Sequence, residues 1–129
     1  MVRIVFFTLI FILSCEFLNP TESYIISDNQ FFEIQDTDYT LIDVRTSEEY
    51  ESGHIQNALN FDFYSESFHK EILSLEKNTQ IILYCRTQNR SKKTADFLKE
   101  NGYREINVIE GGITSWVKNG NDLAYNISE

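Results

Sequence analysis

The strongest constraint on the fold is a series of short, nearly continuous apolar runs separated by stretches of helical periodicity. Apolar runs that indicate strands occupy residues 24–26, 40–44, 58–61, 79–85 and 106–112. Strands buried on both faces of a parallel sheet have this continuous pattern, whereas half-exposed strands alternate apolar and polar residues. We therefore predict an α/β fold in which helices cover both faces of a parallel sheet.

Helix signals fill the segments between these runs. They are expected at residues 28–35, 46–53, 65–78, 91–102 and 113–120. Ser91 can cap the fourth of these helices. The 129 residues suffice for one domain with a real core and are too few for two ordinary ones. We place this domain at residues 24–120, and we expect residues 121–129 to form a loosely held tail.

The N-terminal segment, MVRIVFFTLIFILSC, resembles a secretory signal peptide. Its apolar run, residues 4–13, is shorter than the roughly 20 residues that a membrane-spanning helix needs. The run ends at Ser14 and Cys15, which resemble a bacterial lipobox, so we expect lipid on Cys15 and a tether at residues 16–23. A plain cleaved signal and an uncleaved anchor are the alternatives. The predicted location is the periplasmic side of the bacterial envelope, with only a lipid anchor in the membrane.

Charge excludes some classes of partner. The chain has 20 acidic and 11 basic residues, a formal charge of -9, which disfavours binding to nucleic acid or anionic lipid. Four of the basic residues nevertheless follow Cys85 closely and could receive an anion: Arg86, Arg90, Lys92 and Lys93. The spacing of His, Cys and carboxylate residues suggests no metal site. We expect no cofactor.

Cys85 is the candidate nucleophile. A disulfide to Cys15 is the ordinary expectation for two cysteines in an exported chain, but lipidation or removal of Cys15 would leave Cys85 as a lone thiol. Cys85 ends an apolar strand, where parallel α/β sheets hold their ligands. The loop that follows offers backbone N–H groups and the positive end of a helix dipole, which together lower the pKa of a thiol. A small core cysteine is the alternative.

Three stretches resemble, in order, the signatures of single-domain rhodanese-like sulfurtransferases. They are LIDVRTSEEYESGHI, ILYCRTQNRS and NVIEGGITSW, and the resemblance covers about residues 24–119. It implies a rhodanese-like fold, with a five-stranded parallel sheet and helices on both faces. It also implies that Cys85 carries a persulfide. The loop expected to bind the persulfide and the substrate consists of Arg86, Thr87, Gln88, Asn89, Arg90 and Ser91.

The length of the loop favours sulfur transfer over phosphoryl chemistry. Four residues separate Cys85 from Arg90, whereas related phosphatases and arsenate reductases have five and hold a tetrahedral oxyanion. The expected reaction moves sulfane sulfur from thiosulfate, through Cys85, to cyanide or a thiol such as that of a thioredoxin-like protein. Arg86 or Arg90 would bind the anionic donor. Gln88 stands where the family usually has glycine, so it could narrow the pocket or reshape the loop.

Several alternatives accompany this interpretation. Asp43 and Arg45 are expected to form a structural ion pair that fixes a loop, and His54 a structural hydrogen bond. The protein could be a persulfide carrier or a docking module without turnover, and steady-state turnover separates these functions from the enzyme. A thiol oxidoreductase would require a second nearby cysteine, and a phosphatase would require a longer loop. We expect a monomer.

Overall fold

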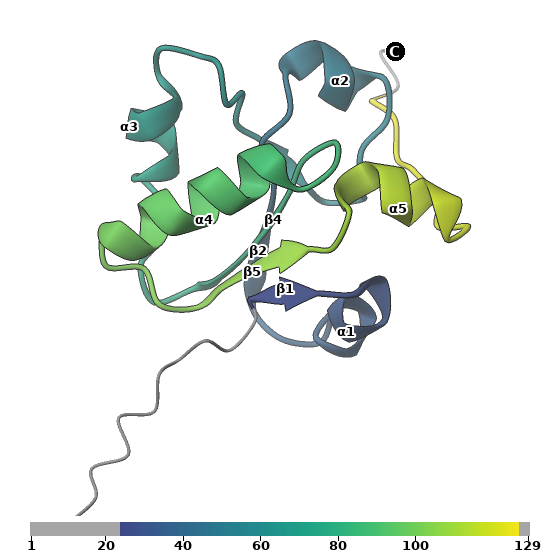
Figure 1. The fold of residues 1–129 in the computed structure, drawn as a ribbon, viewed down its shortest axis with the longest axis horizontal. Coiled ribbons are helices and arrows are strands. Elements are labelled where there is room, and N and C mark those ends of the chain that lie inside the picture. The colour runs from purple at the N-terminus through teal and green to yellow at the C-terminus, as the bar shows by residue number, and fades with distance from the viewer. Residues whose placement is uncertain (1–23, 127–129) are drawn as a thin grey trace, which may run out of the picture.

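Five strands pair in parallel into one sheet, as predicted. The computed structural model describes residues 24–126 (Figure 1). The strands are β1 (Ile25–Ile26), β2 (Tyr39–Asp43), β3 (Leu59–Asn60), β4 (Gln80–Tyr84) and β5 (Ile106–Ile109). Their spatial order is β1-β5-β4-β2-β3, so β4 lies at the centre of the sheet. The carboxyl ends of all five strands therefore meet at one edge.

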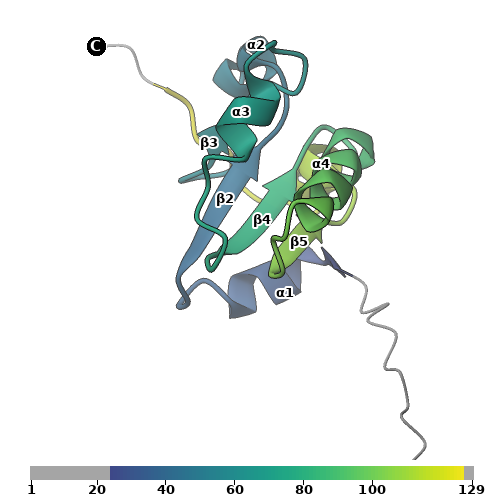
Figure 2. The same ribbon diagram turned by 90° about the vertical axis from the view of Figure 1, so that its left-hand side faces the viewer.

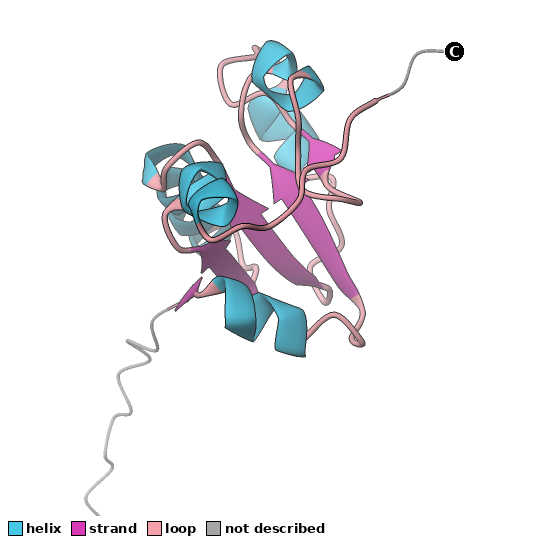
Figure 3. Ribbon diagram, turned by 90° about the vertical axis from the view of Figure 1, so that its right-hand side faces the viewer, coloured by secondary structure: helices cyan, strands magenta, loops and turns pink. Residues whose placement is uncertain are grey.

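Helices cover both faces of the sheet (Figures 2 and 3). They are α1 (Asp28–Glu33), α2 (Ser47–Glu51), α3 (Phe68–Ile72), α4 (Asn89–Glu100) and α5 (Gly112–Lys118). One core packs α3 and α4 on the sheet through Ile72, Leu83 and Leu98. The other packs α1 and α5 through Phe31 and Trp116. The sequence prediction of an α/β fold with helices on both faces is confirmed.

The burial of strand β4 explains its central position in the sheet. Residues Ile81, Ile82, Leu83 and Tyr84 are each at most 1 % exposed, so both faces of the strand are buried. Complete burial of such a side chain contributes on the order of 2 kcal/mol, which makes a central parallel position the favourable one. The strand consequently holds the residue that follows it, Cys85, at the carboxyl edge of the sheet.

Helix α3 is much shorter than the predicted segment 65–78. It ends at Ile72, and the hydroxyl of Tyr103 lies within hydrogen-bond distance of two carbonyl oxygens beyond it, 2.9 Å from that of Leu73 and 2.8 Å from that of Leu75, so it can donate its one proton to either. A side chain from another element thus supplies a hydrogen bond to the carbonyls that follow the helix, which favours the end of the helix here. The apolar spacing on which the prediction relied could not reveal this distant partner.

The segment after α5 differs from the loose tail that we expected. Ala124 and His54 exchange two backbone hydrogen bonds, of 3.0 and 2.8 Å, in an isolated antiparallel bridge. The indole Nε1 of Trp116 donates to the carbonyl of Asp122 at 2.9 Å, and the amide of Asn121 donates to Asp28. Residues 121–125 therefore lie against the domain.

The predicted signal peptide, the tether and Cys15 lie outside the residues that the structure describes. Within residues 24–126, no helix has the length and apolar character needed to cross a membrane.

Candidate functional site

The candidate site is built on the turn from β4 into α4. Cys85 follows β4 directly and is 1 % exposed. Its Sγ lies 3.4 Å from the hydroxyl of Ser91, and that hydroxyl lies 3.1 Å from the carbonyl oxygen of Gln88. A hydroxyl has one proton, so Ser91 donates to Gln88 when Cys85 is a protonated thiol and can turn its proton toward a thiolate.

The sequence analysis predicted that Ser91 caps the helix, and this prediction is wrong. Helix α4 starts at Asn89, with Gln88 in the capping position and without a side-chain cap. Ser91 instead lies in the first turn, completely buried, and its side chain contacts Cys85. Because the helix starts earlier than predicted, the hydroxyl of Ser91 lies beside the sulfur of Cys85. As a cap, the same hydroxyl would have bonded to a backbone N–H group.

In the loop after Cys85, backbone carbonyl groups accept hydrogen bonds from α5, whereas the backbone N–H groups donate none within the described residues. The carbonyl of Cys85 accepts from the N–H of Ile113 at 2.9 Å, and that of Arg86 accepts from both the N–H and the hydroxyl of Thr114. Within the described part of the chain, no acceptor serves the backbone N–H groups of the loop residues Arg86, Thr87, Gln88, Asn89 and Arg90. A run of free N–H groups at a helix start suits an anion.

Gly112 lets α5 pack against the loop. It has φ +58, and a Cβ at this position would collide with the carbonyl oxygens of Cys85 and Thr87. The paired glycines thus do more than close a strand, which is all that the sequence pattern indicated. They allow the backbone of α5 to approach that of the loop closely enough for the hydrogen bonds of Ile113 and Thr114.

Gln88 has a negative φ and a hydrogen-bonded side chain in this loop. Its φ is -161°, outside the left-handed region that favours glycine, so the position does not require the glycine that is usual in the family. Its side-chain Oε1 accepts a hydrogen bond from the backbone N–H of Gly111 at 2.9 Å. The side chain therefore ties the loop to the turn before α5.

Arg90 is occupied by an ion pair that the sequence analysis missed. Its Nη1 and Nη2 donate to Oε2 and Oε1 of Glu49 at 2.7 and 2.9 Å. These hydrogen bonds, with help from Thr46, lower the pKa of Glu49 to about 2, although burial opposes the shift. The pKa of Arg90 is raised, mainly by Glu49 and less by Cys85. The available signal was the acidic pair in TSEEY, which lies within the helix predicted at residues 46–53.

Asp43 and Arg45 form a second, fully buried ion pair at the carboxyl end of β2. Arg45 Nη2 donates to Asp43 Oδ2 and to the carbonyl of Gly53, both at 2.7 Å. His54 is buried beside them, with Nδ1 3.1 Å from the carbonyl oxygen of Tyr50 and its ring stacked on that of Tyr50. These contacts connect β2 to the loop after α2, and α2 is the helix that carries Glu49, the partner of Arg90.

A cavity of about 440 Å³ opens beside the loop. Arg86 lines it from the loop, and Glu49, the partner of Arg90, lines it from α2. The remaining walls include three apolar side chains: Ile113, Val117 and Leu123. Among the described residues, the exposed guanidinium of Arg86 has no acidic partner. Arg86 is therefore the cation of this cavity that is available to a ligand.

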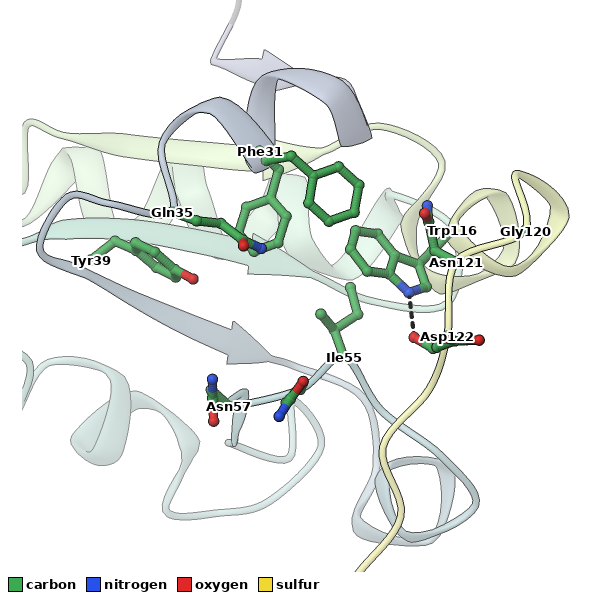
Figure 4. Close-up of a pocket in the computed structure, with 11 residues that line it drawn as sticks. Phe31, Gln35, Tyr39, Ile55, Asn57, Trp116, Gly120, Asn121 and Asp122 are labelled. Carbon is green, nitrogen blue, oxygen red and sulfur yellow. Dashed lines mark hydrogen bonds between the residues drawn. The ribbon is translucent and has the colours of Figure 1, made fainter.

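A second pocket, of about 500 Å³, lies between α1, α5 and the C-terminal segment (Figure 4). Its lining consists of aromatic side chains, from Phe31, Tyr39 and Trp116, together with the amide side chains of Gln and Asn residues. No residue of the Cys85 loop lines it. Because it also offers no nucleophile, we place the candidate active site at the loop.

A central cysteine at the carboxyl edge of a parallel sheet, followed by a loop of free N–H groups, defines a rhodanese-type domain. Comparison with known proteins agrees. The chain belongs to the family described as "Rhodanese-like domain", whose sequence model matches residues 32–119.

Similar proteins include a rhodanese-related protein from Thermoplasma volcanium, with 29% identity and a TM-score of 0.68 over 77% of this chain and 95% of that one. A rhodanese-like domain protein from Staphylococcus aureus has 25% identity and a TM-score of 0.68, over 80% and 98% of the two chains. An Escherichia coli tRNA uridine(34) hydroxylase is 34% identical over 93 residues, 69% of this chain. The chain spans about a quarter of the length of that relative, 27%.

Proposed function

We propose that the protein is a sulfurtransferase in which Cys85 carries sulfane sulfur as a persulfide. The observation that supports this most directly is the set of backbone N–H groups after Cys85 that have no acceptor within the described residues. They suit one added sulfur bearing negative charge, because four residues to Arg90 make a small cradle. The family membership supports the same chemistry.

The proposed reaction has two steps. The Cys85 thiolate attacks the outer sulfur of thiosulfate, a bond forms between the two sulfurs, and the bond from the outer sulfur to the sulfonate group breaks. Sulfite leaves with that electron pair, and Cys85 becomes a persulfide anion. In the second step cyanide takes the outer sulfur as thiocyanate, or a thiolate takes it as a new persulfide, and the Cys85 thiolate returns. No electrons are supplied from outside.

The surrounding residues have distinct roles in this proposal. Ser91 can donate a hydrogen bond to the thiolate form of Cys85, from 3.4 Å. Arg90 is held by Glu49, so it adds local positive charge without being free to follow a ligand. Arg86, exposed and without an acidic partner in residues 24–126, receives the anionic donor.

Single-turnover mass spectrometry tests the proposal. The full chain is mixed with thiosulfate, and the intact mass is expected to rise by one sulfur on Cys85. Cys85→Ser should gain no sulfur, and Cys15→Ser, which removes the other cysteine, should gain it normally. Thiocyanate formation with cyanide then establishes turnover. A persulfide without turnover would favour the carrier function instead, and the absence of any persulfide would refute both.

We also propose, from the N-terminal sequence, that the protein is exported and lipidated on Cys15, where a periplasmic thioredoxin-like protein could accept the sulfur. Protein isolated from the membrane fraction should start at Cys15 and carry a diacylglyceryl mass. An unmodified chain that retains residues 1–15 would overturn this proposal and leave the sulfurtransferase proposal untouched.

A further inference from the structure

The second pocket, of about 500 Å³, has the volume of a small-molecule site and an aromatic floor. Two rings of this floor are buried, since Phe31 is 1% and Trp116 is 4% exposed. Phe32 also lines the pocket and contacts Trp116, with ring centroids 5.3 Å apart, yet it is 46% exposed. The pocket therefore offers a ligand the exposed surface of one aromatic ring, that of Phe32.

Polar groups without a partner line the same pocket. Within residues 24–126, the carboxamides of Gln35 and Asn57 and the hydroxyl of Tyr39 have no hydrogen-bond partner. Figure 4 shows them on three separate segments: the turn after α1, the start of β2 and the loop before β3. Each of these groups can both donate and accept a hydrogen bond. A ligand with closely spaced groups that also donate and accept would satisfy them.

The charge of the pocket disfavours anionic ligands. Among the described residues that line it there is no lysine, arginine or histidine, and Asp122 supplies the one charged side chain. A phosphate or carboxylate group would therefore lie near Asp122 with no cation to balance it, on a chain whose formal charge is already -9. The carboxylate of Asp122 can instead accept hydrogen bonds from the hydroxyl groups of a neutral ligand.

Contacts among the lining residues and their neighbours hold the pocket in shape. The indole Nε1 of Trp116 donates to the carbonyl of Asp122 at 2.9 Å (Figure 4). Asn121 Nδ2 donates to Asp28 Oδ2 at 2.7 Å, and the rings of Phe31 and Trp116 meet edge to face with centroids 5.8 Å apart. A preformed site of this kind loses little conformational entropy when a ligand binds.

We propose that this pocket binds a neutral saccharide. One face of a pyranose ring consists of C–H groups and packs on the exposed ring of Phe32. Its hydroxyl groups both donate and accept, as do the free groups of Gln35, Tyr39 and Asn57. A flat nucleobase fits less well, because Phe32 and Trp116 contact each other and leave no slot between them. The inference does not depend on the proposed sulfurtransferase function, because no residue of the persulfide loop lines the pocket.

The test is an NMR titration of the isotopically labelled full chain with cellobiose, maltose and lactose. Trp116 is the single tryptophan of the chain, so its indole N–H gives one unambiguous signal from the pocket floor. At least one disaccharide should shift this signal, and the side-chain amide signals of Gln35 and Asn57, in a saturable manner. Uridine, and the acidic analogue of that disaccharide with a carboxylate in place of one hydroxymethyl group, should each bind about tenfold more weakly. The absence of any saturable shift with the three disaccharides, or tighter binding of uridine, would refute the proposal.

Variants locate the binding site. Phe32→Leu removes the aromatic surface and should weaken binding about fivefold, whereas Tyr39→Phe and Gln35→Met each remove one polar group and should weaken it about threefold. Tyr125→Phe is the matched control for the hydroxyl, because Tyr125 is 61% exposed, has no hydrogen-bond partner within residues 24–126 and does not line the pocket. Cys85→Ser should bind as the wild type does. Unchanged affinity in all three pocket variants would show that the saccharide binds elsewhere and would overturn the assignment.

Discussion

Gln88 Oε1 lies 2.9 Å from the backbone nitrogen of Gly111, and this hydrogen bond joins the Cys85 loop to the turn that starts α5. The loop is thereby held at two points by the same element, since α5 also donates to the carbonyls of Cys85 and Arg86. The side chain that stands in place of the usual glycine thus acts as a brace and does not distort the loop.

Removal of this brace should weaken the site. Gln88→Met keeps the length of the side chain but removes the acceptor, and it leaves the N–H of Gly111 unsatisfied. We expect a loss of stability of about 1 kcal/mol and a several-fold slower formation of the persulfide, measured by denaturant unfolding and by mass spectrometry. Gln56→Met makes the same change at an exposed position without a hydrogen-bond partner in residues 24–126, and it should be neutral. Equal effects of the two variants would contradict the bracing role.

Close packing at Gly112 gives a second prediction. Gly112→Ala should destabilise the protein by several kcal/mol and abolish persulfide formation, because its Cβ meets the carbonyl oxygens of Cys85 and Thr87. Gly120→Ala is the control: Gly120 has φ +85, but a Cβ there meets nothing within 4 Å. The free energy of unfolding of that variant should fall by only about 1 kcal/mol, because alanine is strained at a positive φ. Thermal unfolding measures both, and an equally mild Gly112→Ala would show that the approach of α5 is not tight.

The ion pair of Glu49 and Arg90 predicts an acid-dependent stability. The folded state lowers the pKa of Glu49 from 4.5 to about 2, so the stabilisation is complete above pH 4.5 and is lost as the pH falls toward 2. Denaturant unfolding of the wild type and of Glu49→Gln across this range should give a smaller decrease for the variant. The same decrease in both proteins would mean that Glu49 does not carry this pH dependence.

Ser91 gives a prediction about the nucleophile. Ser91→Ala removes the one side-chain hydrogen bond that the structure shows for Cys85, at 3.4 Å, and leaves a residue small enough for the buried position. Formation of the persulfide should slow about fivefold, since the thiolate loses a donor. Ser74→Ala, at an exposed hydroxyl that bonds only to Glu71, should leave the rate unchanged. An unchanged rate in Ser91→Ala would assign all stabilisation of the sulfur to the backbone.

The fold was predictable from the sequence because its signals are local. The uninterrupted apolar run before Cys85 specifies a buried strand, and strand and helix patterns alternate along the domain. The contacts that shape the site are not local: 41 residues separate Glu49 from Arg90 and 23 separate Gln88 from Gly111. Spacing along one element cannot show such pairs. For this reason, the prediction that Arg90 binds the donor did not include its ion pair with Glu49.

The C-terminal segment has a consequence for how the site could be switched off. Leu123 is part of the cavity wall, and Ala124 pairs with His54. Gly53 has no side chain to obstruct the segment, since a Cβ there would lie 3.0 Å from both Leu123 and Tyr125. A protease that cut the chain just after Gly120 would therefore remove one wall of the cavity and the partner of His54 together. Cys85 and its loop would remain covalently intact, but Arg86 would face an open surface.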